Sequence, residues 1–398
     1  MKKLLSVVLA LLMLAVTLPV TAMADDANYC TIEGVNGKFD TLTAAAKAWR
    51  ESKGVVTEGN TFGANNLGTV ESIVWDIYGT VPVGDGAGVA GDNGAGECIF
   101  TGGYFTPAVT VSKVTVIGHN NATISKTNDK YLVSVNANEV VFANITFEDT
   151  MRNTGNPGSL TFTNCTFKAG LRMPHAGANS TLKVENCTFT GEESDGYAIF
   201  VQGTMTNVVL SGNQISNAKR GINVQADSTA TVSITGNTIT NLTGKTGNGG
   251  TYGSAIQLTS GQTFNVTGNT IDTGIVNAFH FYTGLDANVT INNNKIKAPY
   301  LLWNEANLPQ DNITSSGNVL DIDNPGQAKT KTAVIPTETV INGTTAPGTI
   351  TIIVPSTEET KPAEDQKNPT TGANDLVAVA VAAAALALAG SAIILRKD

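Results

Sequence analysis

Three side chains in the second half of the chain have the chemistry to act on a substrate: Arg220, His280 and Tyr282. A lyase needs a base and a group that neutralises its acidic substrate, and a histidine or tyrosine beside an arginine could serve. A glycoside hydrolase needs two carboxylates roughly 5–10 Å apart, whereas Asp227 and Asp286 stand alone. The sequence therefore leaves catalysis uncertain and favours binding over turnover.

A wider set of polar residues recurs in short strand-like segments at 198–202, 221–225, 255–259, 278–282 and 300–304. Alternation turns the apolar residues of each segment inward, so the intervening residues face outward. The predicted ligand-binding face consists of Arg172, Gln202, Asn223, Gln225, Gln257, Thr259, His280, Tyr282 and Asn304, with Phe200 and Leu302 in the same column as His280 and with Arg152 one rung above Arg172. Amides, hydroxyls and a guanidinium in a row suit a polyhydroxylated chain such as a glycan. A solvated strand face without a ligand is the alternative.

Two variable loops flank this predicted face, and function gathers in such loops. The loop at 191–197 carries Glu192, Glu193 and Asp195, which could hold calcium. The loop at 241–253 is rich in glycine. No histidine or cysteine spacing predicts zinc, and no other cofactor is expected.

The elements that must position these residues follow from a repeat. One pattern of alternating apolar residues, a turn and a further apolar residue occurs eight times, as at 232–239, 264–271 and 289–296. Successive copies are 20 to 32 residues apart, too close for a crossover helix in every repeat. A coil of strands, each turn lying about 4.8 Å from the last, satisfies this spacing.

Equivalent positions of the copies should stack along the coil. One column would contain Phe147, Phe167, Phe189, Ile215, Ile239, Ile271, Ile296 and Leu320. Another would contain Ile145, Cys165, Cys187, Asn213, Asn237, Asn269, Asn294 and Asn318, with each inward asparagine amide bonding its neighbours. The predicted fold is all-β, a right-handed parallel β-helix over 114–324.

With its asparagine column and Gly-Asn-x-Ile turns, the chain resembles the pectin-lyase-like β-helix superfamily over roughly residues 30 to 324. The resemblance implies a substrate lying along the face described above. It does not imply one activity, because the superfamily includes lyases, hydrolases, tailspikes and adhesins. The paired aspartates and the Gly-His-Gly and Arg-Ile-Lys motifs of polygalacturonases are missing. The closest match is at 117–120, where His119, like His175, is predicted to be a turn residue.

Residues 25–113 are predicted to form an N-terminal cap and the first coils. An amphipathic helix begins near Asp40, which is a good N-cap residue, and ends near Gly54. It would bury Leu42, Ala45, Ala46 and Trp49. Among the four cysteines, Cys30 could pair with Cys98, and Cys165 and Cys187 could form either a disulfide or a pair of stacked buried thiols.

The two ends of the chain predict export. Residues 1–24 have the basic, apolar and small-residue regions of a signal peptide. Residues 325–367, rich in Thr, Pro, Lys and Glu, predict an extended wall-spanning stalk. The segment 376–395 has no charge and is long enough to cross a membrane.

The segment 368–398 resembles the cell-wall sorting signal of Gram-positive surface proteins. Its motif reads Asn368, Pro369, Thr370, Thr371 and Gly372, with Asn368 in place of the family's leucine. The resemblance implies that a sortase cuts after Thr371 and joins the chain to peptidoglycan. The membrane would then be contacted only through the apolar span before sorting.

Composition narrows the partners. The 398 residues carry a net charge of −9, and only 14% of them are charged. An acidic chain offers no basic face for nucleic acid. We predict a monomeric, wall-anchored, adhesin-like protein that binds a glycan or a host surface. An anchored polysaccharide lyase or glycoside hydrolase is the alternative, and a passive spacer without a ligand is a third.

Overall fold

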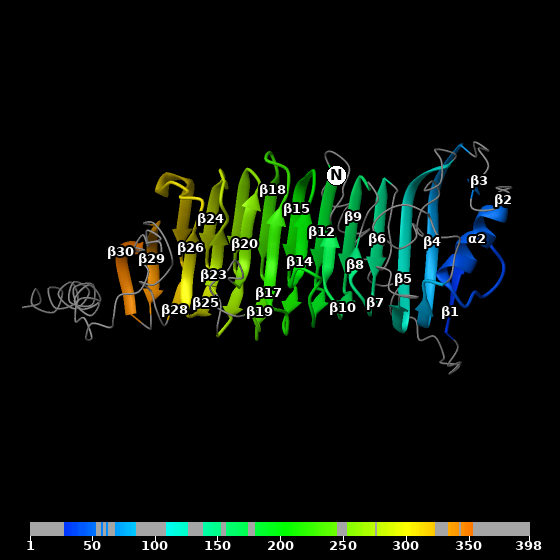
Figure 1. Cartoon of the computed structure of the whole chain (residues 1–398), viewed down its shortest axis with the longest axis horizontal. Helices are drawn as coiled ribbons and strands as arrows, with labels where there is room; N and C mark the ends of the chain where they lie inside the picture. Colours follow the sequence, from blue (N-terminus) through cyan, green and yellow to red (C-terminus); the bar gives the residue numbers. More distant parts are fainter. Residues whose placement is uncertain are drawn as a thin grey trace, which may run out of the picture.

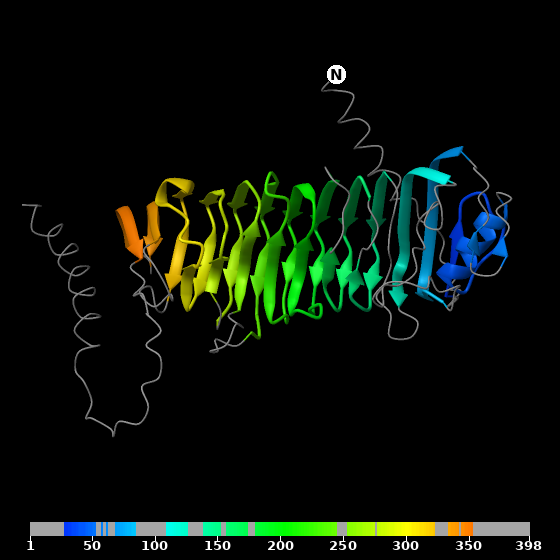
Figure 2. The ribbon, with the colours of Figure 1, turned by 45° about the horizontal axis from the view of Figure 1, so that its top comes forward.

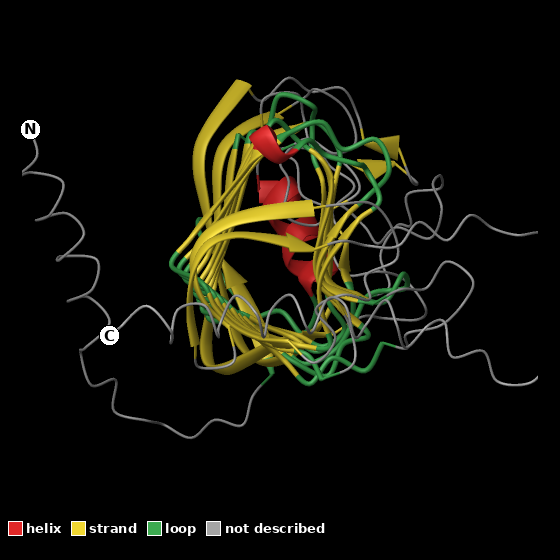
Figure 3. Cartoon of the chain, turned by 90° about the vertical axis from the view of Figure 1, so that its left-hand side faces the viewer, coloured by secondary structure: helices red, strands yellow, loops and turns green. Residues whose placement is uncertain are grey.

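The computed structural model describes residues 28–52, 57–58, 61–62, 68–84, 109–125, 138–152, 157–173, 180–244, 253–274, 277–322, 333–341 and 344–352. In this part the strands lie side by side along one long axis, from the blue N-terminal end to the orange C-terminal end (Figures 1 and 2). Viewed along that axis, they surround a common interior (Figure 3).

Three strands make up most coils. The first strands are β6 (Glu139–Ala143), β9 (Ser159–Thr163), β12 (Ser180–Glu185), β15 (Met205–Ser211), β18 (Thr231–Thr235), β21 (Thr263–Thr267), β24 (Asn288–Asn292) and β27 (Ile313–Ser316). The second strands are β7 (Thr146–Phe147), β10 (Thr166–Phe167), β13 (Thr188–Phe189), β16 (Gln214–Ile215), β19 (Thr238–Thr240), β22 (Thr270–Asp272), β25 (Lys295–Ala298) and β28 (Val319–Ile322). The third strands are β8 (Met151–Arg152), β11 (Leu171–Met173), β14 (Tyr197–Gln202), β17 (Arg220–Gln225), β20 (Ser254–Ser260), β23 (Asn277–Phe281) and β26 (Tyr300–Asn304).

Strands of successive coils pair in parallel. First and second strands belong to one large sheet, and the third strands form a second sheet in the order β26-β23-β20-β17-β14-β11-β8. The eight copies of the sequence repeat coincide with the eight pairs of first and second strands from β6–β7 to β27–β28. The parallel β-helix predicted from the repeat is therefore confirmed.

The turn between the first and second strands uses left-handed backbone. Asn144, Asn164 and Asn186 have φ of 59°, 53° and 55° there, and Gly212 and Gly236 have φ of 65° and 64°. Asparagine and glycine are the residues that adopt this conformation at least cost. This explains why only these two residue types occupy this position of the repeat.

The predicted asparagine column is present and buried. The backbone N–H of Asn237 donates to Oδ1 of Asn269 at 2.9 Å, and its side-chain Nδ2 donates to the Leu210 carbonyl at 2.9 Å. Asn213, Asn269 and Asn294 repeat the pattern with their own neighbours. The Asn237 amide, for example, accepts from the Asn213 N–H and donates to the Leu210 carbonyl, so each amide satisfies two backbone groups of the preceding coil.

The aromatic column is also present. The rings of Phe147 and Phe167 stack with centroids 5.0 Å apart, and those of Phe167 and Phe189 with centroids 4.6 Å apart. Cys165 and Cys187 continue the asparagine column as free, buried thiols, with the Cys165 N–H donating to the Cys187 sulfur at 3.4 Å. The stacked-thiol prediction is correct and the disulfide alternative is wrong. Cys30 is also a buried free thiol, and Cys98 lies outside the described residues.

At the N-terminal end, β1 (Tyr29–Ile32) pairs antiparallel with β4 (Gly68–Pro82), which pairs in parallel with β5 (Val109–Ser125). The small strands β2 (Thr57–Glu58) and β3 (Thr61–Phe62) form a separate ribbon. The helix α2 (Leu42–Ser52) buries Leu42, Ala45, Ala46 and Trp49 as predicted. Figure 1 shows α2 at the end of the coil; its role as a cap stays a prediction.

Two local predictions at this end are wrong. Thr41, not Asp40, caps α2, because its Oγ1 accepts a hydrogen bond from the Ala44 N–H at 3.1 Å.

His119 lies within β5 rather than in a turn. Its Nε2 is 2.8 Å from Oδ1 of Asp76, and its ring stacks on Tyr78. The pairing of β4 with β5 places these side chains on neighbouring strands.

At the C-terminal end, the short 3₁₀ helix η1 (Gln310–Asn312) precedes β27. The strands β29 (Ala333–Ile341) and β30 (Thr344–Ile352) form an antiparallel hairpin, and β29 pairs in parallel with β28. The hairpin occupies part of the segment predicted as an extended stalk. The predicted signal peptide, sorting signal and apolar span lie outside the described residues, among which no helix is long and apolar enough to cross a membrane.

Candidate functional site

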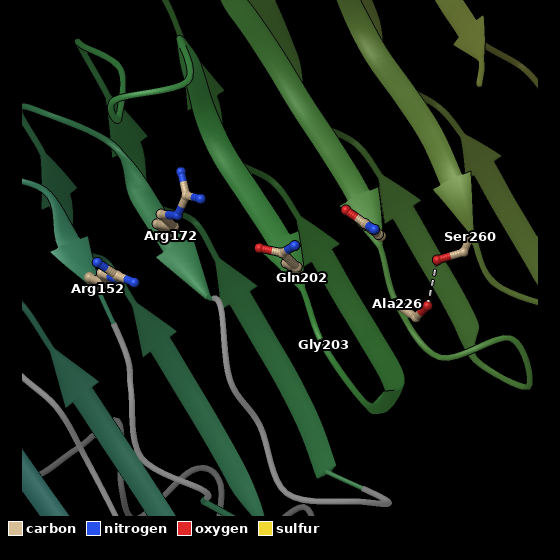
Figure 4. Close-up of a pocket in the computed structure, with 7 residues that line it drawn as sticks. Arg152, Arg172, Gln202, Gly203, Ala226 and Ser260 are labelled. Carbon is tan, nitrogen blue, oxygen red and sulfur yellow. Dashed lines mark hydrogen bonds between the residues drawn. The ribbon is translucent and has the colours of Figure 1, made fainter. Parts of the chain in front are cut away.

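A groove of about 510 Å³ crosses the sheet of third strands. Its lining residues are Arg152, Arg172, Gln202, Gly203, Gln225, Ala226 and Ser260. Figure 4 shows Arg152 and Arg172 on neighbouring strands, followed by Gln202 and, further along, Ser260. The groove thus presents guanidinium, amide and hydroxyl groups from successive coils at a spacing of about 4.8 Å.

The acidic loop before β14 holds Arg172 in place. Nη1 of Arg172 donates to Oε2 of Glu193 at 2.8 Å and also bonds to Asp195. The Glu193 side chain is fully buried, and its other oxygen accepts from the backbone N–H of Tyr197 at 3.1 Å. Burial lowers the pKa of Arg172, but the hydrogen bonds and charges of the two carboxylates outweigh this effect and raise it. Arg172 is thus a charge-neutralised hydrogen-bond donor in a fixed position.

Three central residues of the predicted face belong to a buried network rather than an open surface. Asn223, Gln257 and His280 are only 5%, 6% and 3% exposed. The Tyr197 hydroxyl lies 2.8 Å from Oε1 of Gln257, and Nδ1 of His280 lies 3.2 Å from the same oxygen. Tyr197 of β14 thus reaches past β17 to Gln257 of β20, and Gln257 contacts His280 of the adjacent β23. Asn223, Gln257 and His280 are therefore not accessible to a ligand.

Groups at the edges of this network complete it. Nε2 of His280 lies 2.9 Å from Oε2 of Glu305, and its ring stacks on Trp303 with centroids 4.0 Å apart. Nη1 of Arg220 donates to the Tyr197 hydroxyl at 2.8 Å. Thr259 Oγ1 lies 2.9 Å from Oδ1 of Asn223. Every polar side chain of the network therefore has a protein partner.

Burial sets the protonation of the network. It lowers the pKa of His280, and this effect exceeds the opposing hydrogen bond and charge of Glu305. It raises the pKa of Tyr197 despite the nearby charge of Arg220. His280 is therefore poorly suited to hold a proton, and Tyr197 is poorly suited to lose one.

Of the three predicted catalytic candidates, two belong to the network and the third lies at the surface beside it. Arg220 and His280 belong to the buried network, where Tyr197 and Gln257 lie between them. Tyr282 is 43% exposed just beyond β23, with its ring edge-on to His280 at 5.5 Å between centroids.

Two assignments in the last coil are wrong. His280 pairs with Trp303, so Leu302 lies in the neighbouring inward column beside Phe279. Asn304 pairs with Phe281 and is 1% exposed. It bonds both the N–H and the carbonyl of Leu308, at 3.0 and 3.1 Å, so it is a structural residue and not part of a ligand-binding face.

A third assignment changes because of an irregularity in β20. The register between β17 and β20 shifts after Val224, so Gln225 lies opposite Ser260 and not Thr259. Ser260 enters the groove, and its hydroxyl donates to the Ala226 carbonyl at 2.6 Å (Figure 4). Gln202 and Gln225 are adjacent as predicted, and so are Arg152 and Arg172.

Sequence reasoning missed four residues: Tyr197, Ser260, Trp303 and Glu305. Trp303 lies in a strand that was identified, and a wide aromatic in an outward position is a signal for stacking. Tyr197 was assigned to the loop 191–197, whereas it is the first residue of β14. Glu305 directly follows the last third strand, and its contact with His280 depends on how the chain turns after Asn304.

The three carboxylates of the acidic loop are used in ion pairs, whereas Asp227, which follows Ala226, accepts hydrogen bonds from Thr229. Glu192 pairs with Lys219 at 2.7 Å, and Glu193 and Asp195 pair with Arg172. Across the described residues, no group of three or more histidine, cysteine or acidic side chains is arranged to hold a metal ion. The acidic loop at 192–195 thus binds cationic side chains of the protein itself.

Comparison with known proteins identifies the fold family. The model of the right-handed β-helix region matches residues 98–251 and 151–320, which together span more than half of the chain. The chain belongs to this right-handed β-helix family. No curated protein and no solved structure shows a significant match.

Membership in the right-handed β-helix family agrees with the parallel pairing of every coil from β6 to β28. The family defines an architecture, and one architecture supports many activities. Function must therefore be argued from the groove and the network.

Proposed function

We propose that this right-handed β-helix protein is exported, anchored to the cell wall of a Gram-positive bacterium by a sortase, and binds a glycan or glycan-coated host surface without cleaving it. The groove supports the binding part of this proposal. Its amides and guanidinium groups are aligned along the coil axis, so a polyhydroxylated chain lying along that axis would meet one polar side chain in each coil.

One observation carries the non-catalytic part. Among the residues that the structure describes, the groove is lined by guanidinium, amide and hydroxyl groups and by no carboxylate, histidine or tyrosine side chain. Retaining and inverting glycosidases require a pair of carboxyl groups, and the nearby Glu193 and Asp195 are engaged with Arg172. The described lining therefore offers donors for binding and no acid–base pair.

The test is binding of the full chain, purified in mild detergent, to a panel of neutral and acidic glycans. Removing two amide hydrogen bonds by Gln202→Ala with Gln225→Ala should weaken binding about tenfold, because each is worth about 0.5–1.5 kcal/mol. Gln214→Ala, an exposed glutamine on the other sheet, should leave affinity unchanged. Equal binding by the double variant would rule out the groove.

A wall-anchored polysaccharide lyase or glycoside hydrolase is the second candidate. The contact of His280 with Glu305 at 2.9 Å, beside Arg220, Tyr197 and Tyr282, is the observation that favours it. In that case the same glycan panel should yield unsaturated or reducing ends, and His280→Gln should abolish their release. Binding without release of such ends supports the first candidate.

A further inference from the structure

A second surface with an unusual composition lies on the large sheet, away from the groove. We call it the polar lattice and define it as the outward side chains of β18, β21 and β24. In β18 these are Thr231, Ser233 and Thr235, and their partners in β21 and β24 are all threonine or asparagine. The nine side chains include no charged and no apolar group.

The lattice is regular in two directions. β18, β21 and β24 pair in parallel over five residues each, without any shift in register. Equivalent side chains are therefore about 4.8 Å apart across the strands and about 7 Å apart along them. The sheet containing the groove is less regular, because its register shifts after Val224.

The polar groups of the lattice are available to a partner. All nine residues are exposed or half-exposed. Within the described structure, the one side-chain hydrogen bond that they make runs from Ser316 of β27 to Asn292, at 3.0 Å. Their donors and acceptors are thus free to contact another molecule, and the threonines are stiff at χ1, so ordering them costs little entropy.

Charged residues occur elsewhere on the same sheet. Asp272, Lys295 and Lys297 follow the turn after β21 and β24, and Lys183 and Glu185 face outward on β12, which is separated from the lattice by the uncharged strand β15. A soluble surface usually carries about 25–35% charged residues with both signs mixed. The lattice therefore lacks the groups that are most costly to desolvate, as expected for a face that comes into close contact with a neutral partner.

We propose that the polar lattice is a second binding site, separate from the groove, for the ordered face of a neutral polysaccharide whose chains are packed side by side. A rigid partner with hydroxyl groups repeating in two dimensions can meet rows and columns of the lattice together. A single soluble polysaccharide chain would contact only one row of the lattice, and no groove would enclose it. Each lattice binds weakly, and many copies on one surface add avidity.

Self-association through this face is less favoured on area. The lattice is three strands wide and three outward residues long, so its area is only on the order of 150 Å². Each partner in a stable protein complex buries about 800 Å². The packed polysaccharide requires no such area, because neighbouring copies of the protein can bind the same surface.

The experiment is sedimentation of the full chain, in mild detergent, with insoluble microcrystalline cellulose or chitin. Asn265→Lys places a charge at the centre of the lattice and should reduce the bound fraction at least tenfold. It should still fold, because Lys183 occupies an outward position on the same sheet. Gln214→Lys adds the same charge away from the lattice and should bind like the wild type, with circular dichroism checking both folds.

The outcomes are decisive. The Gln202→Ala, Gln225→Ala variant should bind the insoluble polysaccharide normally, so failure of the groove and failure of the lattice are distinguishable. Soluble oligosaccharides of the same sugar should not compete. Wild-type protein that stays in solution, or equal binding by Asn265→Lys, would overturn the proposal. So would a dimer in analytical ultracentrifugation that Asn265→Lys converts to monomer.

Discussion

At the scale of single residues, burial decides what the polar side chains of the third strands do. Gln202 and Gln225 remain accessible in the groove, whereas Asn223 and Gln257 of the same sheet are nearly fully buried. Gln257 and Asn223 are bonded by Tyr197 and Thr259, whereas Gln202 and Gln225 are the last residues of β14 and β17. A polar residue in an outward position is therefore not by itself a ligand contact.

His280 should make folding stability depend on pH. Its folded pKa is lowered by burial, so below about pH 6.5, the ordinary histidine pKa, the unfolded state takes up the proton more readily. Stability should therefore fall as the pH drops from 7.5 to 5.5. In His280→Gln this loss should be smaller, by up to about 1.4 kcal/mol per pH unit. Urea unfolding at several pH values measures it, and identical slopes for the two proteins would contradict the assignment.

At the scale of elements, the asparagine column connects the turns of successive coils. In Asn237→Ala, the buried N–H of Asn213 and the carbonyl of Leu210 lose their partner. An unsatisfied buried group costs about 1–3 kcal/mol, so the variant should lose about 2–4 kcal/mol of unfolding free energy. Asn265→Ala, on the outward face of β21, should change it by less than about 0.5 kcal/mol. A similar midpoint of urea unfolding for both variants would show that the column is not stabilising.

The turns show why one part of the pattern tolerates two residue types. Asn293 and Gly317 occupy successive turns of the coil with φ of 55° and 64°. The next residue along the chain belongs to the inward asparagine column, and its Oδ1 accepts a hydrogen bond from the backbone of the preceding coil. The turn residue itself therefore has only to adopt the left-handed backbone conformation. From Asn213 onward the inward column is therefore always asparagine, whereas the turn position, where only a conformation is required, holds either asparagine or glycine.

At the scale of the whole molecule, the strands of each coil pair only with strands of adjacent coils, so damage should remain local. Phe167 stacks between Phe147 and Phe189. Phe167→Ala should cost about 3–5 kcal/mol and increase amide hydrogen exchange in β7, β10 and β13. Exchange in β25 and β28, several coils away, should change little. A uniform increase along the whole chain would instead indicate a single cooperative unit.

The sequence by itself determined the coil. The columns of Phe, Cys and Asn were predictable because every coil repeats the same local environment, so the same position can be compared between many copies of the repeat. Strand alternation likewise identified the groove residues Arg172, Gln202 and Gln225.

Only the tertiary structure decided which outward residues are accessible to a ligand and in which register the last third strand, β26, pairs with β23. Trp303 rather than Leu302 lies beside His280, and Asn304 turns inward. These outcomes depend on the length and path of the segments between strands and on long side chains such as Arg172 and Glu305 that reach across coils. Such contacts occur once and carry no periodic signal, so the pattern that revealed the fold could not reveal them.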